Sequence, residues 1–168
     1  VQTCALPICT ETTYTGDGSN GVAGQAYKVH SFTASSTLQV AAPGFCDILV
    51  VGGGGGGGGN WGGGAGAGAH LYATNVYIPV GSLTVTIGAG GAAFTTNNYG
   101  NNGIASSLAG IFYAPGGGGG GARMVSTETS QVGLNGGSGG GSSRYTSGSA
   151  AAGGAGISGL GNSGGQGN

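Results

Sequence analysis

The chain of 168 residues contains 46 glycines but only three Lys or Arg and four Asp or Glu, for a formal net charge of −1. The three cations, Lys28, Arg123 and Arg144, are scattered and cannot neutralise a row of phosphates, which excludes a nucleic-acid partner. Membrane insertion is excluded as well, because no apolar run approaches the roughly 20 residues of a membrane span. Glycine-rich chains are often disordered, but disorder also goes with high net charge and few apolar residues. We therefore expect an ordered domain of unusual composition.

Residues 1–8, Val-Gln-Thr-Cys-Ala-Leu-Pro-Ile, resemble a common sequencing adapter translated in one reading frame. We interpret them as foreign to the natural protein, as a fusion scar would be; the alternative is a genuine N-terminal strand. We also expect the chain to be a fragment, incomplete at its N-terminus and truncated at its C-terminus. Once Cys4 is set aside, Cys9 and Cys46 remain, and free thiols are favoured over a disulfide between them. No CxxC spacing supports a zinc site.

Short apolar or alternating runs predict β-strands along the chain. Residues 9–26 are polar and are interpreted as a leader or edge segment, and residues 27–168 as the glycine-rich β domain. Strands are expected at 27–32, 37–40, 45–51, 70–78, 83–87, 104–108 and 111–113. The continuous apolar run 45–51 predicts a strand buried on both faces, and Pro79-Val80-Gly81 predicts a hairpin between the two strands that flank it. Glycine is too frequent for helices, so the fold class is all-β.

Glycine runs at 52–59, 62–68 and 116–121 lie directly against these strands. Ordering eight glycines costs roughly 8–16 kcal/mol of backbone entropy, which only dense backbone packing can offset. Threefold, polyproline-II-like rods can pack in this way, because their N–H and C=O groups point outward and glycine lets neighbouring rods approach. We therefore predict a β-sandwich-like core with packed polyglycine segments, rather than flexible linkers. The structural glycines are Gly52, Gly53, Gly54, Gly116 and Gly117; for the tail after Gly136, order and disorder both stay open.

Several blocks carry a family resemblance. Asp47-Ile48-Leu49-Val50-Val51 precedes eight glycines, Trp61-Gly62-Gly63-Gly64-Ala65-Gly66 follows them, and Pro79 to Gly91 and Ala114 to Ala122 supply two further blocks. In this order they resemble the glycine-rich domain of phage tail fibres and large bacterial surface proteins. The resemblance implies host recognition or surface adhesion, at a virion tail fibre or outside the cell. Tail-fibre tip adhesins of related composition pack polyglycine rods and bind receptors through the loops between them. A host cell-surface glycan or outer-membrane protein is the implied partner, together with self-association in a fibre.

The loops between glycine runs hold the candidate binding residues. One candidate loop contains Asn97, Asn98, Tyr99 and Asn101, and another contains Arg144 and Tyr145. Aromatic rings that give contact area, beside small polar groups that give hydrogen bonds, are typical of adaptable binding loops. The alternative is that both are solvated turns, since Asn and Gly favour turns. Residues 123–135 are interpreted as a variable loop, and Trp61 as a structural anchor on polyglycine rather than a ligand contact.

The sequence supports no enzyme. Glycine repeats occur without the Gly-Lys-Ser/Thr of a P-loop or the helix of a dinucleotide site, and no nucleophile elbow is present. We interpret His30 and His70 as strand residues, and Asp47 as facing solvent or a backbone amide. Glu11 and Glu128 are too far apart in the sequence to suggest a glycosidase pair. We expect no catalytic residue, metal or cofactor. Besides an adhesin, a bacterial extracellular structural module without a specific receptor remains open; the regular Gly-x-x triplet of an ice-binding bundle is absent.

Overall fold

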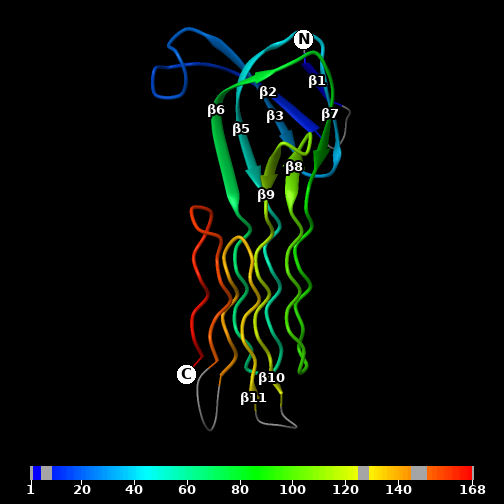
Figure 1. Cartoon of the computed structure of the whole chain (residues 1–168). Helices are drawn as coiled ribbons and strands as arrows, with labels where there is room; N and C mark the ends of the chain where they lie inside the picture. Colours follow the sequence, from blue (N-terminus) through cyan, green and yellow to red (C-terminus); the bar gives the residue numbers. More distant parts are fainter. Residues whose placement is uncertain (1, 5–8, 125–128, 145–150, 168) are drawn as a thin grey trace.

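The computed structural model describes residues 2–4, 9–124, 129–144 and 151–167 and contains no helix among them. Its strands gather mainly at one end, and long extended segments run side by side away from them (Figure 1). The strands are β1 (Gln2–Cys4), β2 (Cys9–Thr15), β3 (Ala26–Phe32), β4 (Ser36–Val40), β5 (Gly44–Val51), β6 (His70–Ile78), β7 (Gly81–Thr86), β8 (Ser106–Leu108), β9 (Phe112–Ala114), β10 (Arg123–Met124) and β11 (Thr129–Ser130). The all-β prediction is confirmed.

Two sheets enclose the hydrophobic core in a sandwich-like arrangement. One has five strands in the order β1-β4-β7-β8-β9, and the other is formed by β5 and β6. In β4, Leu38 and Val40 are buried while Gln39 between them is exposed, which is the alternation of a strand with one face on a core. The other buried members of the core are Ile48, Val50, Ala69, Ile78, Val85 and Ala114. The core is therefore small and confined to the strand end of the molecule.

Two strand predictions are wrong. The strand β5 was expected to be buried on both faces, but Phe45, Leu49 and Val51 are 68%, 62% and 55% exposed, because no described segment covers the outer face of the β5–β6 sheet. The expected hairpin through Pro79-Val80-Gly81 is also absent. Strand β6 pairs with β5, whereas β7 pairs with β4 and β8, so this turn carries the chain from one sheet to the other.

The N-terminal segment interpreted as a leader supplies an edge strand. Its β2 pairs with β3 from Cys9↔Phe32 to Thr15↔Ala26, and the rings of Tyr14 and Tyr27 stack with centroids 5.2 Å apart. Before it, β1 pairs with β4 at residues 2–4, within the octapeptide that resembles adapter sequence. The adapter interpretation stays a prediction.

The two cysteines at issue are in different states. Cys9 is disulfide-bonded and fully buried, whereas Cys46 is a free thiol, so the two do not pair with each other. The expectation of a thiol is thus confirmed for Cys46 and wrong for Cys9. Burial raises the pKa of Cys46, and the negative charge of Asp47 raises it further. Asp47 was predicted to face solvent or a backbone amide. Its carboxylate accepts a hydrogen bond from the backbone N–H of Asn75 at 2.9 Å, in agreement with the second alternative.

Below the strands, nine extended segments of the described chain run back and forth; we call them rods. They are rod 1 (52–59), rod 2 (62–69), rod 3 (87–94), rod 4 (100–105), rod 5 (115–122), rod 6 (131–136), rod 7 (137–144), rod 8 (151–156) and rod 9 (161–167). Rods 7–9 belong to the glycine-rich tail whose order the sequence left open. They are part of the same lattice: Gly118 N–H bonds to Ser138 O, Gly139 N–H to Asn162 O, and Gly164 N–H to Gly154 O, each at 2.9 Å.

The hydrogen bonds between rods repeat every third residue. Rod 1 donates to rod 2 from Gly52, Gly55 and Gly58, at 2.8–3.1 Å. It donates to rod 4 from Gly53 and Gly56, and to Asn98 in the turn before rod 4 from Gly59, at 2.8–3.1 Å. A β-ladder would return to the same neighbour every second residue, whereas a threefold helix returns every third. The rods are therefore the packed polyproline-II-like segments that the sequence predicts.

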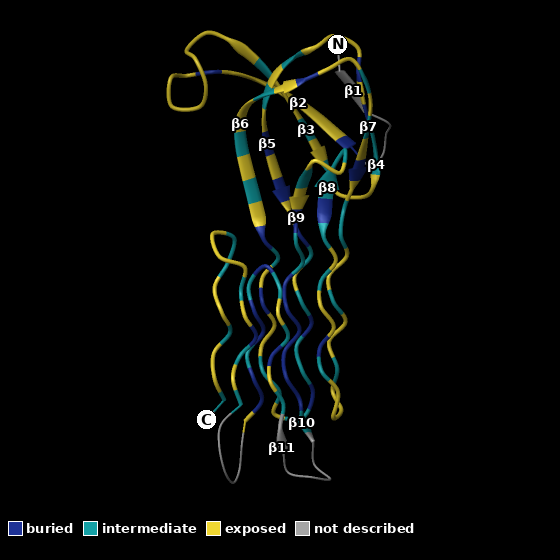
Figure 2. Ribbon diagram, viewed as in Figure 1, coloured by how far each residue is buried: buried dark blue, intermediate teal, exposed yellow. Residues whose placement is uncertain are grey.

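Glycine is required inside this lattice because neighbouring backbones touch. A Cβ atom at Gly52, Gly53, Gly116 or Gly117 would overlap a backbone carbonyl oxygen of another segment. At Gly54 the nearest atom would be Gly66 O at 3.9 Å, so space does not require glycine there. Residues 117–122 of rod 5 are all buried, which makes rod 5 the centre of the bundle (Figure 2). Alanines of the outer rods lie at exposed positions, such as 65, 67, 89 and 92.

One asparagine side chain replaces a backbone group in the lattice. Asn102 Oδ1 accepts the N–H of buried Gly119 at 2.8 Å, and Asn102 Nδ2 donates to Asn135 O at 3.1 Å. We expect Asn102→Ala to lower the free energy of unfolding by about 1–3 kcal/mol, because it leaves a buried N–H without an acceptor. Asn101→Ala, at the exposed neighbouring residue, should change it by less than about 0.5 kcal/mol. Urea denaturation of both variants measures the difference, and equal effects would contradict the role of Asn102.

Candidate functional site

The turns between rods meet at the end of the molecule away from the sandwich, which we call the distal tip. Asn60 and Trp61 join rods 1 and 2, residues 95–99 join rods 3 and 4, and β10 and β11 lie between rods 5 and 6 (Figure 1). Rod 7 ends here at Arg144, which donates its backbone N–H to Trp61 O at 3.1 Å. The rods thus bring residues from four distant parts of the sequence to one surface.

Trp61 is the centre of this tip. Its side chain is 58% exposed, and its ring carries the guanidinium groups of Arg123 and Arg144, whose Cζ atoms lie 4.6 and 5.4 Å from the ring centroid. Both distances are within the range of a cation–π interaction. The sequence predicted an anchor on polyglycine; the ring contacts that the structure shows are with two arginines. Two of the three cations in the chain therefore lie on one exposed aromatic ring.

Asn60 ties the neighbouring loops together. Its Nδ2 donates to Asn97 Oδ1 at 3.0 Å and approaches Arg123 O at 3.4 Å. One amide thereby connects the turn after rod 1, the turn after rod 3 and the start of β10. Asn60 was not among the predicted site residues, although an Asn between two glycine runs is a turn signal.

The turn that holds Trp61 has an unusual backbone. Asn60 and Trp61 have φ values of 50° and 57°, in the left-handed region that glycine adopts without cost. For a residue with a Cβ this conformation costs roughly 1–2 kcal/mol, although Asn tolerates it better than other residues. A chain so rich in glycine nevertheless has tryptophan at this position. Strained backbone of this kind clusters at functional sites, so the observation favours a binding role for Trp61.

The predicted loop residues differ in what they offer. Asn97 is exposed, Tyr99 is half-buried, and Asn98 uses its backbone in the lattice, since its C=O accepts from Gly59 N–H at 3.1 Å. Asn101 belongs to rod 4, where its backbone bonds to Gly56 and Ala92 and its side chain is exposed. Arg144 lies on Trp61, and Tyr145 falls outside the described residues. The tip therefore brings together Asn97 and Arg144 from the two predicted loops.

A family model described as a glycine-rich domain matches residues 31–168. The chain belongs to this family. Among curated proteins and among solved structures, no match is found. The match to the glycine-rich domain covers β4–β11 and all nine rods, and leaves out most of the β2–β3 hairpin. In the described part of the domain, no helix is long and apolar enough to cross a membrane.

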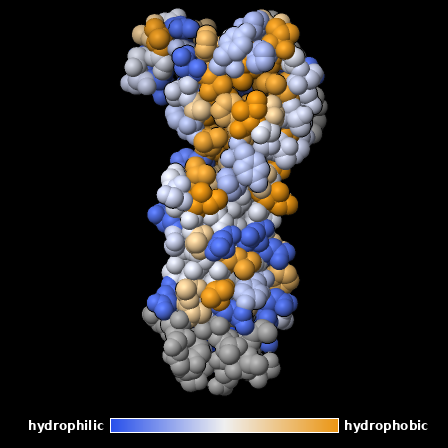
Figure 3. Space-filling view, in the orientation of Figure 1, coloured by the Kyte–Doolittle hydropathy of each residue, from blue (hydrophilic) through white to orange (hydrophobic). Residues whose placement is uncertain are grey.

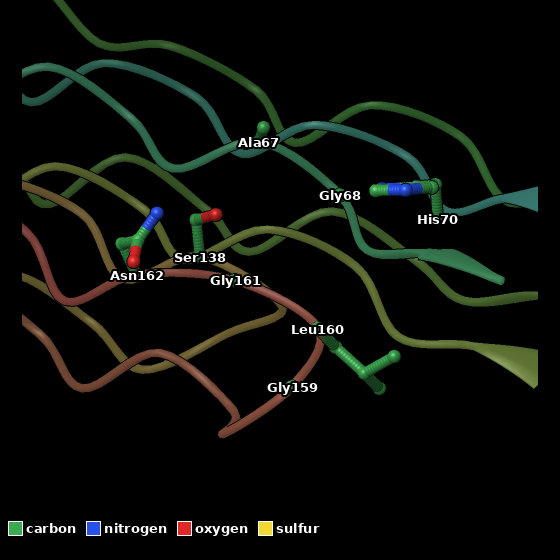
Figure 4. A pocket seen from close by; sticks show the side chains of 8 residues that line it. All are labelled: Ala67, Gly68, His70, Ser138, Gly159, Leu160, Gly161 and Asn162. Carbon is green, nitrogen blue, oxygen red and sulfur yellow. The ribbon is translucent and has the colours of Figure 1, made fainter.

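A hollow lies where the rods of the glycine-rich domain meet the strands. It has a volume of about 440 Å³ and is lined by Ala67, Gly68, His70, Ser138, Gly159, Leu160, Gly161 and Asn162. Figure 4 shows His70 and Leu160 at one end of the hollow and Ser138 and Asn162 at the other. These side chains do not converge on a common point. Within the described ranges no group of three His, Cys, Asp or Glu could hold a metal ion.

Trp61→Gly separates a binding role from a structural one. We expect the free energy of unfolding to change by less than about 1 kcal/mol, because relief of the left-handed backbone offsets the lost cation–π contacts. A buried anchor would instead lose about 3–5 kcal/mol on truncation. Chemical denaturation of the full chain measures the change, and a loss in that larger range would show that Trp61 is mainly structural.

Proposed function

We propose that this glycine-rich domain is a structural and adhesive module of a phage tail fibre or a related receptor-binding adhesin, which contacts a host surface through its distal tip. The observation that carries the proposal is the exposed Trp61, held in strained backbone among polar side chains from four separate segments. Such a tip combines aromatic contact area with amide and guanidinium donors, as binding loops do. The proposed receptor is a host cell-surface glycan or outer-membrane protein, and the proposed location is the virion or the cell exterior.

The rods support this proposal by what they do not contain. Their interior is backbone packed on backbone, and only scattered side chains such as Asn101, Ile104 and Val132 are exposed along their length. Recognition then falls to the residues that interrupt the glycine at the tip. The hydrogen-bonded lattice places those residues at the end of the molecule away from the sandwich.

A second candidate, an extracellular structural module without a specific receptor, is favoured by the outer face of the β5–β6 sheet. Phe45, Leu49, Tyr72 and Tyr77 are all more than half exposed there, and Phe45 and Tyr77 pack edge to face at 5.6 Å. Apolar residues gather over the strand end in Figure 3, whereas the rods below show pale, hydrophilic and smaller apolar patches side by side. Exposed apolar patches of this kind mark contacts with other proteins, which suits assembly into a fibre.

Binding of the full chain to a panel of intact bacterial cells and to a glycan array tests the proposal. We expect the Asn97→Ala/Tyr99→Ala double variant to lose binding while folding as the parent does. Tyr113→Ala is the matched control, because Tyr113 is 58% exposed but lies in β9, at the strand end. Binding that survives the tip variant, or that only Tyr113→Ala removes, would overturn the proposal. Absence of binding to every surface would favour the structural module.

A further inference from the structure

The charges of the described residues are separated along the length of the molecule. Among the described residues the acids Glu11, Asp17 and Asp47 belong to the strand end, as does Lys28, which pairs with Glu11 at 2.7 Å. The described charges of the distal tip are the two guanidinium groups on Trp61. Glu128 lies outside the described residues. Exposed charges act over a Debye length of about 8 Å at physiological salt, so the described acids of the strand end do not cancel the field of the tip.

We propose that Arg144, held on Trp61, is the anion-binding group of the distal tip, and that the tip takes a sugar carrying a carboxylate or phosphate. The inference rests on the proposed function, namely that the tip contacts a receptor. It adds the chemical class of that receptor, which the predicted loops alone did not specify.

The geometry leaves the donors of Arg144 accessible. Arg144 is exposed, and its guanidinium makes no hydrogen bond or ion pair with any residue that the structure describes. The cation–π contact of Arg144, with Cζ 5.4 Å from the ring centroid, does not depend on a hydrogen bond to an oxygen or nitrogen acceptor, so the in-plane N–H donors of the guanidinium keep that capacity. That edge matches the two oxygens of a carboxylate or phosphate. Trp61 therefore holds Arg144 at the tip without accepting a conventional hydrogen bond from it.

The groups around Arg144 suit a sugar better than a free ion. The exposed part of the Trp61 ring offers an apolar surface for the C–H groups of a pyranose, as aromatic platforms do for other flat ligands. Asn97 is exposed and uses its Oδ1 for Asn60, so its Nδ2 donors remain available to a hydroxyl. A free anion without a sugar ring would contact only the Arg144 guanidinium and would leave Trp61 and Asn97 unused.

Binding to immobilised polygalacturonate, phosphomannan and neutral dextran tests the inference, with the full chain measured by biolayer interferometry at low and high salt. We expect binding to one or both anionic polymers, weakened by salt, and little to dextran. Arg144→Gln should weaken anionic binding at least about tenfold, the loss typical of a charge-assisted hydrogen bond. Arg144→Lys should recover only part of it, because an ammonium lacks the planar fork. Lys28→Gln removes the same charge at the strand end and should bind as the parent does. An unchanged thermal midpoint in each variant shows that folding is intact.

The result also separates the inference from the proposed function. Equal binding to dextran, no binding to either anionic polymer, or parent-like binding by Arg144→Gln would overturn the anionic sugar. If the Asn97→Ala/Tyr99→Ala variant loses cell binding in that case, the tip still contacts a receptor, of a different chemistry. If no tip variant affects cell binding, both fail. A response to polygalacturonate alone assigns a carboxylate sugar, and a response to phosphomannan alone assigns a phosphorylated one.

Discussion

Gly56→Ala is expected to lower the free energy of unfolding by about 3 kcal/mol or more, at the upper end of what overpacking costs. A Cβ at Gly56 would overlap the backbone of Ala92 and Ala93 in rod 3, and no side chain is present there that could move aside. Rods 1 and 3 would have to separate, which also weakens hydrogen bonds such as Gly91 N–H to Gly54 O. Urea denaturation of the full chain measures the change.

Gly57→Ala is the matched control, one residue along the same rod. A Cβ at Gly57 would approach nothing closer than Gly63 O at 4.0 Å, so alanine fits without displacement. Its free energy of unfolding should stay the same or rise by up to about 1 kcal/mol, because alanine restricts the unfolded chain. Similar losses of unfolding free energy for Gly56→Ala and Gly57→Ala would contradict a lattice in which some glycines face a neighbouring rod and others face open space.

Ile78→Ala is expected to lower the free energy of unfolding by about 2–5 kcal/mol, the usual cost of truncating a buried aliphatic side chain. Ile78 is 5% exposed and ends β6 within the small core of the sandwich. The rods bury almost no apolar side chains, so the strand end supplies most of the hydrophobic stabilisation. Thermal and urea unfolding of the full chain both report the loss.

Ile111→Ala removes the same number of carbons from an exposed position. Ile111 is 78% exposed beside the turn between β8 and β9, and its truncation should change the free energy of unfolding by less than about 0.5 kcal/mol. A comparable loss of unfolding free energy for Ile111→Ala would mean that the surface around Ile111 is covered in solution.

The strands could be predicted from the sequence because their signal is local. Alternation at 27–32 and 37–40 corresponds to β3 and β4, and the run 83–87 overlaps β7. Pairing was harder to predict, since Pro79-Val80 reads as a hairpin turn whether the chain returns to the same sheet or crosses to another. The exposure of Leu49 was hidden for a related reason: a run of apolar residues does not show whether a second layer covers it.

The existence of ordered rods could be predicted from the cost of ordering glycine. Which rods lie next to each other could not. Contacts such as Gly120 N–H to Gly56 O join residues far apart in the chain, and every glycine is chemically the same. Besides its backbone bonds, the tail is held by side chains that bond to backbone: Ser142 Oγ donates to Ala151 O at 2.6 Å, and Asn135 Oδ1 accepts from Ala155 N–H at 2.7 Å. No repeat in the sequence shows which groups of neighbouring rods bond to each other.

The candidate site was predicted only as separate loops. Composition selected Asn97 and Arg144, since polar and charged residues stand out among glycines. Arg144 contacts Trp61 and Asn97 bonds to the adjacent Asn60, because the rod lengths bring residues 60, 97, 123 and 144 to the same level. The left-handed backbone at Trp61 could not be read from the sequence either, because a tryptophan does not favour it.

Amide hydrogen exchange at the centre of the bundle tests the account most directly, because ordered glycine rods are its central claim. The N–H groups of Gly118, Gly120 and Gly121 are buried and donate to Ser138 O, Gly56 O and Gly141 O, each at 2.9 Å. We predict that these amides exchange only through large-scale unfolding, as slowly as those of β5 in the sandwich. Exchange at the rate of an unstructured glycine chain would show that the runs are flexible linkers and would contradict the bundle.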